Sequence, residues 1–218
     1  MFLLLFVYVF GGAIAGSSKR YLEFALPGIL VQGTVFSGIQ TALGLSTDFG
    51  RGLIDRFRSL PMSRSAVVGG RVAADGLRVV WGTIVLGGFG VLLGFRFHGS
   101  FLEALAAFAL VIGFGVAVCW PMALIGMSLK TAESVQTAAF LIVLPLTFAS
   151  SVFAPPQTMP AGLRAFVKVN PITALVDATR ALMLGTPAGS SVWRSVAWIA
   201  GIFLVFVPLA VARYRRRA

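Results

Sequence analysis

Long apolar stretches separated by short polar links dominate this sequence. The pattern predicts six helical spans, at residues 1–16, 24–46, 72–95, 103–128, 135–152 and 192–212. An α-helix needs about 20 apolar residues to cross a bilayer, and the first stretch is short of that length. We therefore expect an all-α integral membrane protein with six transmembrane helices. All six belong to one domain, 1–218, and the first span has lost its N-terminal part.

The second predicted span, 24–46, is the most polar one. Spacings of four, three and four residues place Gly33, Ser37, Gln40 and Gly44 on one helical face. Small and polar residues on one stripe are typical of membrane helices that pack closely and share hydrogen bonds. The same stripe also suits the lining of a translocation path, for which Gln32, Ser37 and Gln40 are the candidates. The sequence leaves both interpretations open.

The link between the second and third spans, residues 47–71, has the pattern of a short amphipathic helix. Asp48 can cap its start, and Pro61 marks its stop. Its apolar and charged positions are Phe49, Leu53 and Phe57, and Arg51, Asp55 and Arg58. Such a helix could lie on the lipid surface, but a lipid-binding face would be purely basic. Charges that alternate in sign favour a protein partner.

The segment 153–191 is too polar and too interrupted to be a plain crossing. The pattern predicts one short helix near Leu163 and a second one capped by Asn170, with Pro171 in its first turn and Gly185 as its stop. Both helices are amphipathic, so we expect them to pack on the bundle or in the outer leaflet. They could form a structural lid, or a gate for a cargo that leaves the membrane.

Composition and charge support the interpretation of the chain as a membrane protein. Hydrophobic residues make up 58% of the 218 residues and charged ones only 11%, which excludes a soluble domain of this length. The 18 basic residues against 7 acidic ones would indicate a nucleic-acid partner in a soluble chain. In a membrane protein, the distribution of these basic residues indicates which links lie on the cytoplasmic side. The link 47–71, the fourth-to-fifth link and the C-terminus carry ten Lys and Arg, and the opposite side carries seven. The positive-inside rule therefore predicts cytoplasmic N- and C-termini in the plasma membrane.

Disulfide bonding, metal binding and ATP hydrolysis each need residues that this sequence does not provide. Cys119 has no second cysteine to pair with, and we interpret it as a small buried hydrophobe. His98 has no nearby histidine or cysteine, so no metal site is expected. The sequence contains no Gly-rich phosphate-binding loop ending in Lys-Ser or Lys-Thr. We therefore expect a non-catalytic subunit without cofactors, whose ATP hydrolysis, if any, occurs in a partner.

Two charged positions lie near the edge of the third span. Asp75 and Arg78 are three residues apart and can pair with each other and with Arg71. A channel or secondary carrier would be expected to hold charges at mid-membrane, and the central portions of the predicted spans have none. That class of protein remains an alternative, as does a membrane assembly factor.

The chain resembles the type-2 ABC exporter permeases, and in particular the daunorubicin-resistance permease branch. The residues that carry this resemblance are 55–64, Gly70, Arg71 and Asp75, then Phe153-Ala154-Pro155, Met159-Pro160, 170–173 and 180–182. Their order and spacing fit over essentially the whole chain. The family usually has a cytoplasmic segment before the first span, so we expect either a misassigned start or a natural truncation here.

The resemblance implies an exporter built from two permease subunits and two separate ATP-binding subunits. The second permease is either another copy of this chain or a related one. It further implies that the segment 47–71 is the coupling helix, which supports the roles given above to Phe49, Arg51, Leu53, Asp55, Phe57, Arg58 and Pro61. The expected cargo is a hydrophobic or amphipathic drug, antibiotic or lipid-like compound.

Overall fold

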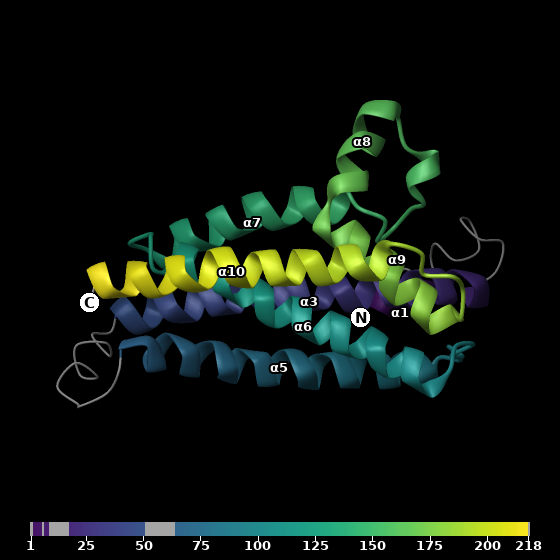
Figure 1. The fold of residues 1–218 in the computed structure, drawn as a ribbon, viewed down its shortest axis with the longest axis horizontal. Helices are drawn as coiled ribbons and strands as arrows, with labels where there is room; N and C mark the ends of the chain where they lie inside the picture. Colours follow the sequence, from purple (N-terminus) through teal and green to yellow (C-terminus); the bar gives the residue numbers. More distant parts are fainter. Residues whose placement is uncertain (1, 6, 9–17, 51–63, 218) are drawn as a thin grey trace.

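The computed structural model describes residues 2–5, 7–8, 18–50 and 64–217 (Figure 1). Its helices are, in chain order, α1 (Phe2–Leu5), α3 (Ser18–Gly50), α5 (Arg64–Leu92), α6 (Phe101–Gly126), α7 (Ala132–Phe148), the short 3-10 helix η2 (Pro156–Thr158), α8 (Ala161–Val169), α9 (Pro171–Leu184) and α10 (Ser191–Arg217). The described residues contain no strand. The prediction of an all-α fold is confirmed for this part of the chain.

Five long helices, α3, α5, α6, α7 and α10, lie side by side along one axis (Figure 1). Helix α3 packs against α5, α6, α7 and α9 and is therefore the centre of the bundle. Helix α6 also contacts α3, α5 and α10. The bundle has two ends. The link end is where α3 stops and α5 begins, and the α9 end, opposite to it, carries α8 and α9.

The long helices have the length and surface of membrane spans. Four of the described helices, α3, α5, α6 and α10, are long and apolar enough to cross a bilayer, and α7 is apolar but has only 17 residues. Large apolar side chains such as Leu141 and Leu204 face outward, with 74% and 76% of their surface exposed. The first expected span, 1–16, lies mostly outside the described residues, so the count of six spans stays a prediction.

Two helix boundaries at the link end differ from the predicted ones. Helix α3 continues past residue 46 to Gly50, and α5 begins at Arg64 instead of residue 72. The proposed helix start at Asp48 is wrong, because Asp48 lies in the last turns of α3. A carboxylate near a helix C-terminus is unfavourable by itself. Here it is neutralised by Arg71 of α5, which it contacts at 2.8 Å.

The boundaries of α7 are shifted from the predicted 135–152 to Ala132–Phe148. The Thr131 side chain accepts a hydrogen bond from the Ser134 backbone N–H, and this cap starts the helix early. The residues after Phe148 form turns in place of a last helical turn. The predicted span therefore corresponds to α7, but its two ends were predicted three and four residues too far along the chain.

The two short helices predicted for 153–191 are present as α8 and α9. Asn170 caps α9, Pro171 is its first residue, and Gly185 follows it with a positive φ of 64°, a conformation that suits glycine. Helix α8 projects away from the long helices (Figure 1). The start and stop signals in the sequence were therefore correct for α9.

Candidate functional site

The central helix α3 has one side that the other described residues leave open. Gly33 and Gln40 are exposed, and Ser37 and Gly44 are half-buried, whereas most of their neighbours on the helix are buried. These are the four residues that the sequence placed on one stripe. The structure therefore confirms that they share a face, and it shows that this face is the least covered one of α3.

Three hollows follow this open side and join into one groove, which we call the α3 groove. A hollow of about 180 Å³ lies between α3 and α5, and one of about 380 Å³ lies among α1, α3, α5 and α7. Gly33 and Leu86 line both of these hollows, and Leu144 connects the second to a shallow hollow along α7. The polar side chains that line the groove are Gln32, Thr34, Ser37, Arg78, Thr83, Gln136 and Thr137.

The polar groups of the groove fall into two kinds. The hydroxyls of Thr34 and Thr83 donate to carbonyls of their own helices, at 2.8 and 2.7 Å. The side chains of Gln32 and Ser37 in the groove, and of Gln40 on the same open side of α3, find no hydrogen-bond partner among the described residues. A polar group in an apolar medium without a partner costs about 1–3 kcal/mol. These three side chains therefore require water, cargo or another chain on this side of α3.

An ion-pair network joins α3 to α5 at the link end of the groove. Asp75 is almost fully buried and accepts hydrogen bonds from Arg71 Nε at 3.1 Å and from Arg78 Nη1 at 2.6 Å. Arg71 Nη1 also donates to Asp48 on α3, at 2.8 Å. The guanidinium of Arg71 occupies the space where a Cβ at Gly44 would lie. The pairing predicted for Arg71, Asp75 and Arg78 is confirmed, and Asp48 extends it to α3.

The link end also contains an aromatic contact between α3 and α10. The rings of Phe49 and Tyr214 meet edge to face, with their centroids 6.0 Å apart. A buried cluster lies beneath them, made of Leu45, Val68, Val72, Cys119, Ala123, Met127, Ala210 and Tyr214.

Of the predicted coupling residues, only Phe49 is described. Arg51, Leu53, Asp55, Phe57, Arg58 and Pro61 lie outside the described residues.

At the α9 end, Asn170 joins the end of α7 to the start of α9. Its side-chain amide donates to the carbonyls of Leu146 and Ala149, both at 2.7 Å, and thereby caps the end of α7. Its side-chain oxygen accepts from the Ile172 N–H at 2.9 Å and caps the start of α9. Asn170 is 2% exposed, so these hydrogen bonds are shielded from water. One side chain thus fixes α9 against α7.

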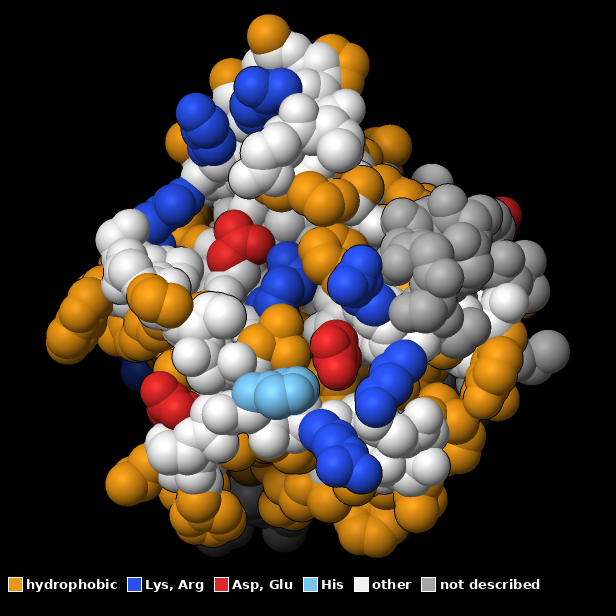
Figure 2. Space-filling model, turned by 90° about the vertical axis from the view of Figure 1, so that its right-hand side faces the viewer, with side chains coloured by type: hydrophobic (Ala, Val, Ile, Leu, Met, Phe, Trp, Pro, Cys, Tyr) orange, Lys and Arg blue, Asp and Glu red, His pale blue; other side chains and the backbone are white. Residues whose placement is uncertain are grey.

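Arg180 fastens α9 to α3 in the same region. Its guanidinium donates to the carbonyls of Phe24 at 3.2 Å and Ser151 at 3.0 Å, and it stacks 4.0 Å from the centre of the Phe24 ring. Burial lowers the pKa of Arg180 to about 10, against the opposite effect of Asp177. The side chain therefore remains charged at neutral pH. Charged side chains gather over the middle of this end, with apolar ones around the rim (Figure 2).

The described residues hold no group of three His, Cys, Asp or Glu side chains that could bind a metal. Cys119 is buried, and its thiol donates to the Gly115 carbonyl at 3.3 Å. The interpretation of Cys119 as a buried small side chain is confirmed. The groove offers hydrogen-bonding and apolar surfaces.

Sequence reasoning missed several residues of the groove and its ends. Arg78 was considered only as an ion-pair partner, yet it also lines the groove with 58% of its side chain exposed. Gln136 could have been identified from the sequence, because it is a polar residue within the fifth predicted span. Arg180 entered the sequence analysis through the resemblance carried by residues 180–182, without a structural role. Only the fold shows that Arg180 reaches carbonyls of residues 24 and 151.

Comparison with known proteins places the chain among membrane transporters. The family model described as ABC-2 type transporter matches residues 1–184. The daunorubicin resistance ABC transporter permease protein DrrB1 of Streptomyces coeruleorubidus is 39% identical over 217 residues, which cover 100% of this chain and 77% of that protein. A Mycobacterium tuberculosis protein, named probable doxorubicin resistance ABC transporter permease protein DrrC, is 29% identical over 191 residues, which cover 87% of this chain and 67% of that protein.

Proposed function

Because this chain belongs to the ABC-2 type transporter family, we propose that it is the membrane permease subunit of an ATP-driven exporter. The full-length similarity to a resistance permease carries this proposal. The structure supports it, since an apolar helical bundle with one polar groove suits a subunit that moves molecules across a membrane. ATP hydrolysis belongs to a separate ATP-binding subunit, because the sequence lacks the phosphate-binding loop.

The α3 groove is our candidate for half of the translocation path. A second permease, either another copy of this chain or a related one, would face it and enclose the path between the two. This arrangement is supported by Gln32, Ser37 and Gln40, whose side chains would otherwise meet lipid without hydrogen-bond partners. Water or the polar groups of a cargo satisfy them in an enclosed path.

The link end is our candidate for contact with the ATP-binding subunits, of which two are expected. The segment between Gly50 and Arg64, whose sequence is amphipathic, connects α3 to α5 at this end. Its residues Leu53 and Phe57 would dock on the partner, while Arg51, Asp55 and Arg58 fix the register and Pro61 ends the helix. The ion pairs of Arg71 join the two helices that border this segment. Movement of the docked segment can thereby reach both walls of the groove.

The charge distribution supports a cytoplasmic position of the link end. Ten of the 18 Lys and Arg residues belong to the links at this end and to the C-terminus. By the positive-inside rule these segments lie in the cytoplasm, and α8 and α9 lie on the outer side. The chain is then a multi-pass protein of the plasma membrane with both termini inside.

The cargo is proposed to be a hydrophobic or amphipathic compound. The names of the two relatives refer to daunorubicin and doxorubicin resistance, which indicates drugs or antibiotics of that kind. The groove fits such molecules, because it combines apolar side chains such as Phe36 and Leu86 with a few hydrogen-bonding groups.

Efflux from vesicles tests this function. The chain and its ATP-binding partner are reconstituted together, and ATP-dependent movement of daunorubicin is measured. Replacing Gln32, which lines the groove, by Ala should reduce transport severalfold. The matched change Gln157→Ala, at an exposed glutamine in η2, should leave transport unchanged. Transport that continues without the ATP-binding subunit would instead indicate a secondary carrier. No transport by any assembly would favour a membrane assembly factor.

A further inference from the structure

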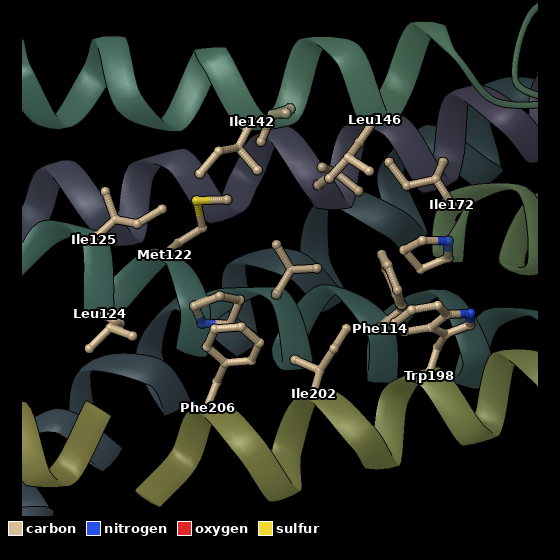
Figure 3. Close-up of a pocket in the computed structure, with 15 residues that line it drawn as sticks. Phe114, Met122, Leu124, Ile125, Ile142, Leu146, Ile172, Trp198, Ile202 and Phe206 are labelled. Carbon is tan, nitrogen blue, oxygen red and sulfur yellow. The ribbon is translucent and has the colours of Figure 1, made fainter. Parts of the chain in front are cut away.

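A second cavity lies on the other side of α3 from the groove and extends to the first residues of α9. It has a volume of about 320 Å³ and is bounded by α3, α6, α7, α9 and α10. Figure 3 shows Met122 and Phe114 of α6, Ile142 of α7, and Ile202 and Trp198 of α10 around it. The residues lining this cavity are distinct from those of the α3 groove.

The lining of this cavity is almost entirely hydrocarbon. All fifteen described lining residues are apolar, aromatic or proline, and none carries a charge, an amide or a hydroxyl. Pockets that orient an amphipathic ligand contain a few placed polar groups, and this one contains none beyond the Trp198 indole. The cavity therefore suits a hydrocarbon chain and offers nothing to hold a polar head or a drug in one orientation.

The position of its mouth indicates what enters it. The cavity runs along the second half of α6, from Phe114 to Ile125, and α7 and α10 form its two lips. These two helices are not packed against each other in the described structure. Ile142 on one lip and Trp198 on the other are 45% and 40% exposed. In a bilayer, hydrocarbon is the medium at this mouth.

We propose that this cavity is a binding site for an acyl chain of a membrane lipid, which enters from the side between α7 and α10. The volume is adequate, since a dry apolar cavity of about 150 Å³ already binds benzene in another protein. At the α9 end of the cavity the chain contacts Pro171 and Ile172, the first residues of α9. The lipid thereby supports the junction that Asn170 forms between α7 and α9. The proposal rests on the proposed function only in placing the chain in a bilayer.

Photolabelling with a phosphatidylethanolamine that carries a diazirine in mid-chain tests the site. The complex with its ATP-binding partner is reconstituted, irradiated and mapped by peptide mass spectrometry. We expect label on Met122 and Ile125, which line the interior. The variant Ile202→Trp fills the cavity and should lower this labelling about tenfold, which corresponds to roughly 1.4 kcal/mol of binding free energy. Ile142→Trp fills it from the opposite lip and should do the same.

The matched control is Leu204→Trp, on the same helix but 76% exposed, and it should leave the labelling of Met122 intact. Equal labelling in all variants would mean that lipid only samples the surface, and would overturn the site. Displacement of the label by daunorubicin would assign the cavity to cargo, and cross-links through this face to a second permease would assign it to an interface. If the vesicles transport daunorubicin but no label reaches Met122 and Ile125, the acyl-chain site is refuted and the proposed function stands. If the label reaches these residues but no transport occurs, the proposed function is refuted and the acyl-chain site stands.

Discussion

The two ends of the bundle are fastened in different ways. At the α9 end, Asn170 and Arg180 donate to backbone carbonyls; Asn170 is buried and the Arg180 side chain is only 16% exposed, so these hydrogen bonds are largely shielded from water. At the link end, Arg71 pairs with the buried Asp75 of its own helix, but the pair that joins α5 to α3, Arg71 with Asp48, is about one-third exposed. Exposed ion pairs are weak and can exchange partners. The difference indicates a fixed α9 end and a link end that can rearrange when an ATP-binding partner moves it.

Removing Asn170 should have the largest effect on stability. In Asn170→Ala the carbonyls of Leu146 and Ala149 lose their donor and α9 loses its cap, at a cost of about 2–4 kcal/mol. The midpoint of thermal unfolding in detergent measures it. The control is Thr131→Ala, which removes the exposed cap of α7 and should cost only about 0.5–1 kcal/mol. Equal losses would contradict the special role of Asn170.

Arg180→Met should be the next most damaging change. It retains much of the packing but removes the donors to the carbonyls of Ser151 and Phe24, which should cost about 1–3 kcal/mol. The same unfolding measurement applies. Arg96→Met is the control, because Arg96 is exposed. If Arg180→Met unfolds at the temperature of the control, the α9 end is not held by this arginine.

The ion pair at the link end should contribute less. A double-mutant cycle of Asp48→Asn and Arg71→Met should give a coupling free energy of about 0.5–1 kcal/mol, as for other partly exposed pairs. It should decrease as salt is raised. A salt-independent coupling above about 2 kcal/mol would mean that the link end is as firmly fastened as the α9 end.

The smallest expected effect is a difference between two glycines near the link end. At Gly70 nothing lies near an added Cβ, so Gly70→Ala should stabilise the helix by about 0.5–1 kcal/mol. At Gly44 the added Cβ would collide with Arg71, so Gly44→Ala should gain nothing and should weaken the Asp48 pair. Unfolding midpoints of the two variants measure this. Equal stabilisation would show that Arg71 moves aside without cost.

Local signals in the sequence were sufficient for much of the fold. Hydrophobic length predicted the positions of the long helices, and the Asn170, Pro171 and Gly185 signals predicted α9 correctly, because capping depends on neighbouring residues. The pairing of Asp75 with Arg71 and Arg78 was also predictable, since these residues lie on one helix.

Contacts between distant segments could not be predicted in this way. Asp48 was taken for a helix start because Asp favours that position, and only the approach of α5 explains why it lies near a helix end. Periodicity placed Gly33, Ser37, Gln40 and Gly44 on one face of α3 but did not show that this face is open, and the other groove-lining residues Arg78 and Gln136 come from α5 and α7. The apolar cavity depends on five helices and has no sequence signature.

The central claim, that ATP acts on this permease through its link end, can be tested by distances between spin labels in the assembled complex. Buried Cys119 is replaced by Ser, and labels are placed on exposed Ala73 and Gln136 at the link end and, separately, on exposed Leu102 and Trp193 at the α9 end. Binding of ATP to the partner subunit should change the first distance and leave the second unchanged. An unchanged link-end distance, or an equal change at the α9 end, would contradict the account.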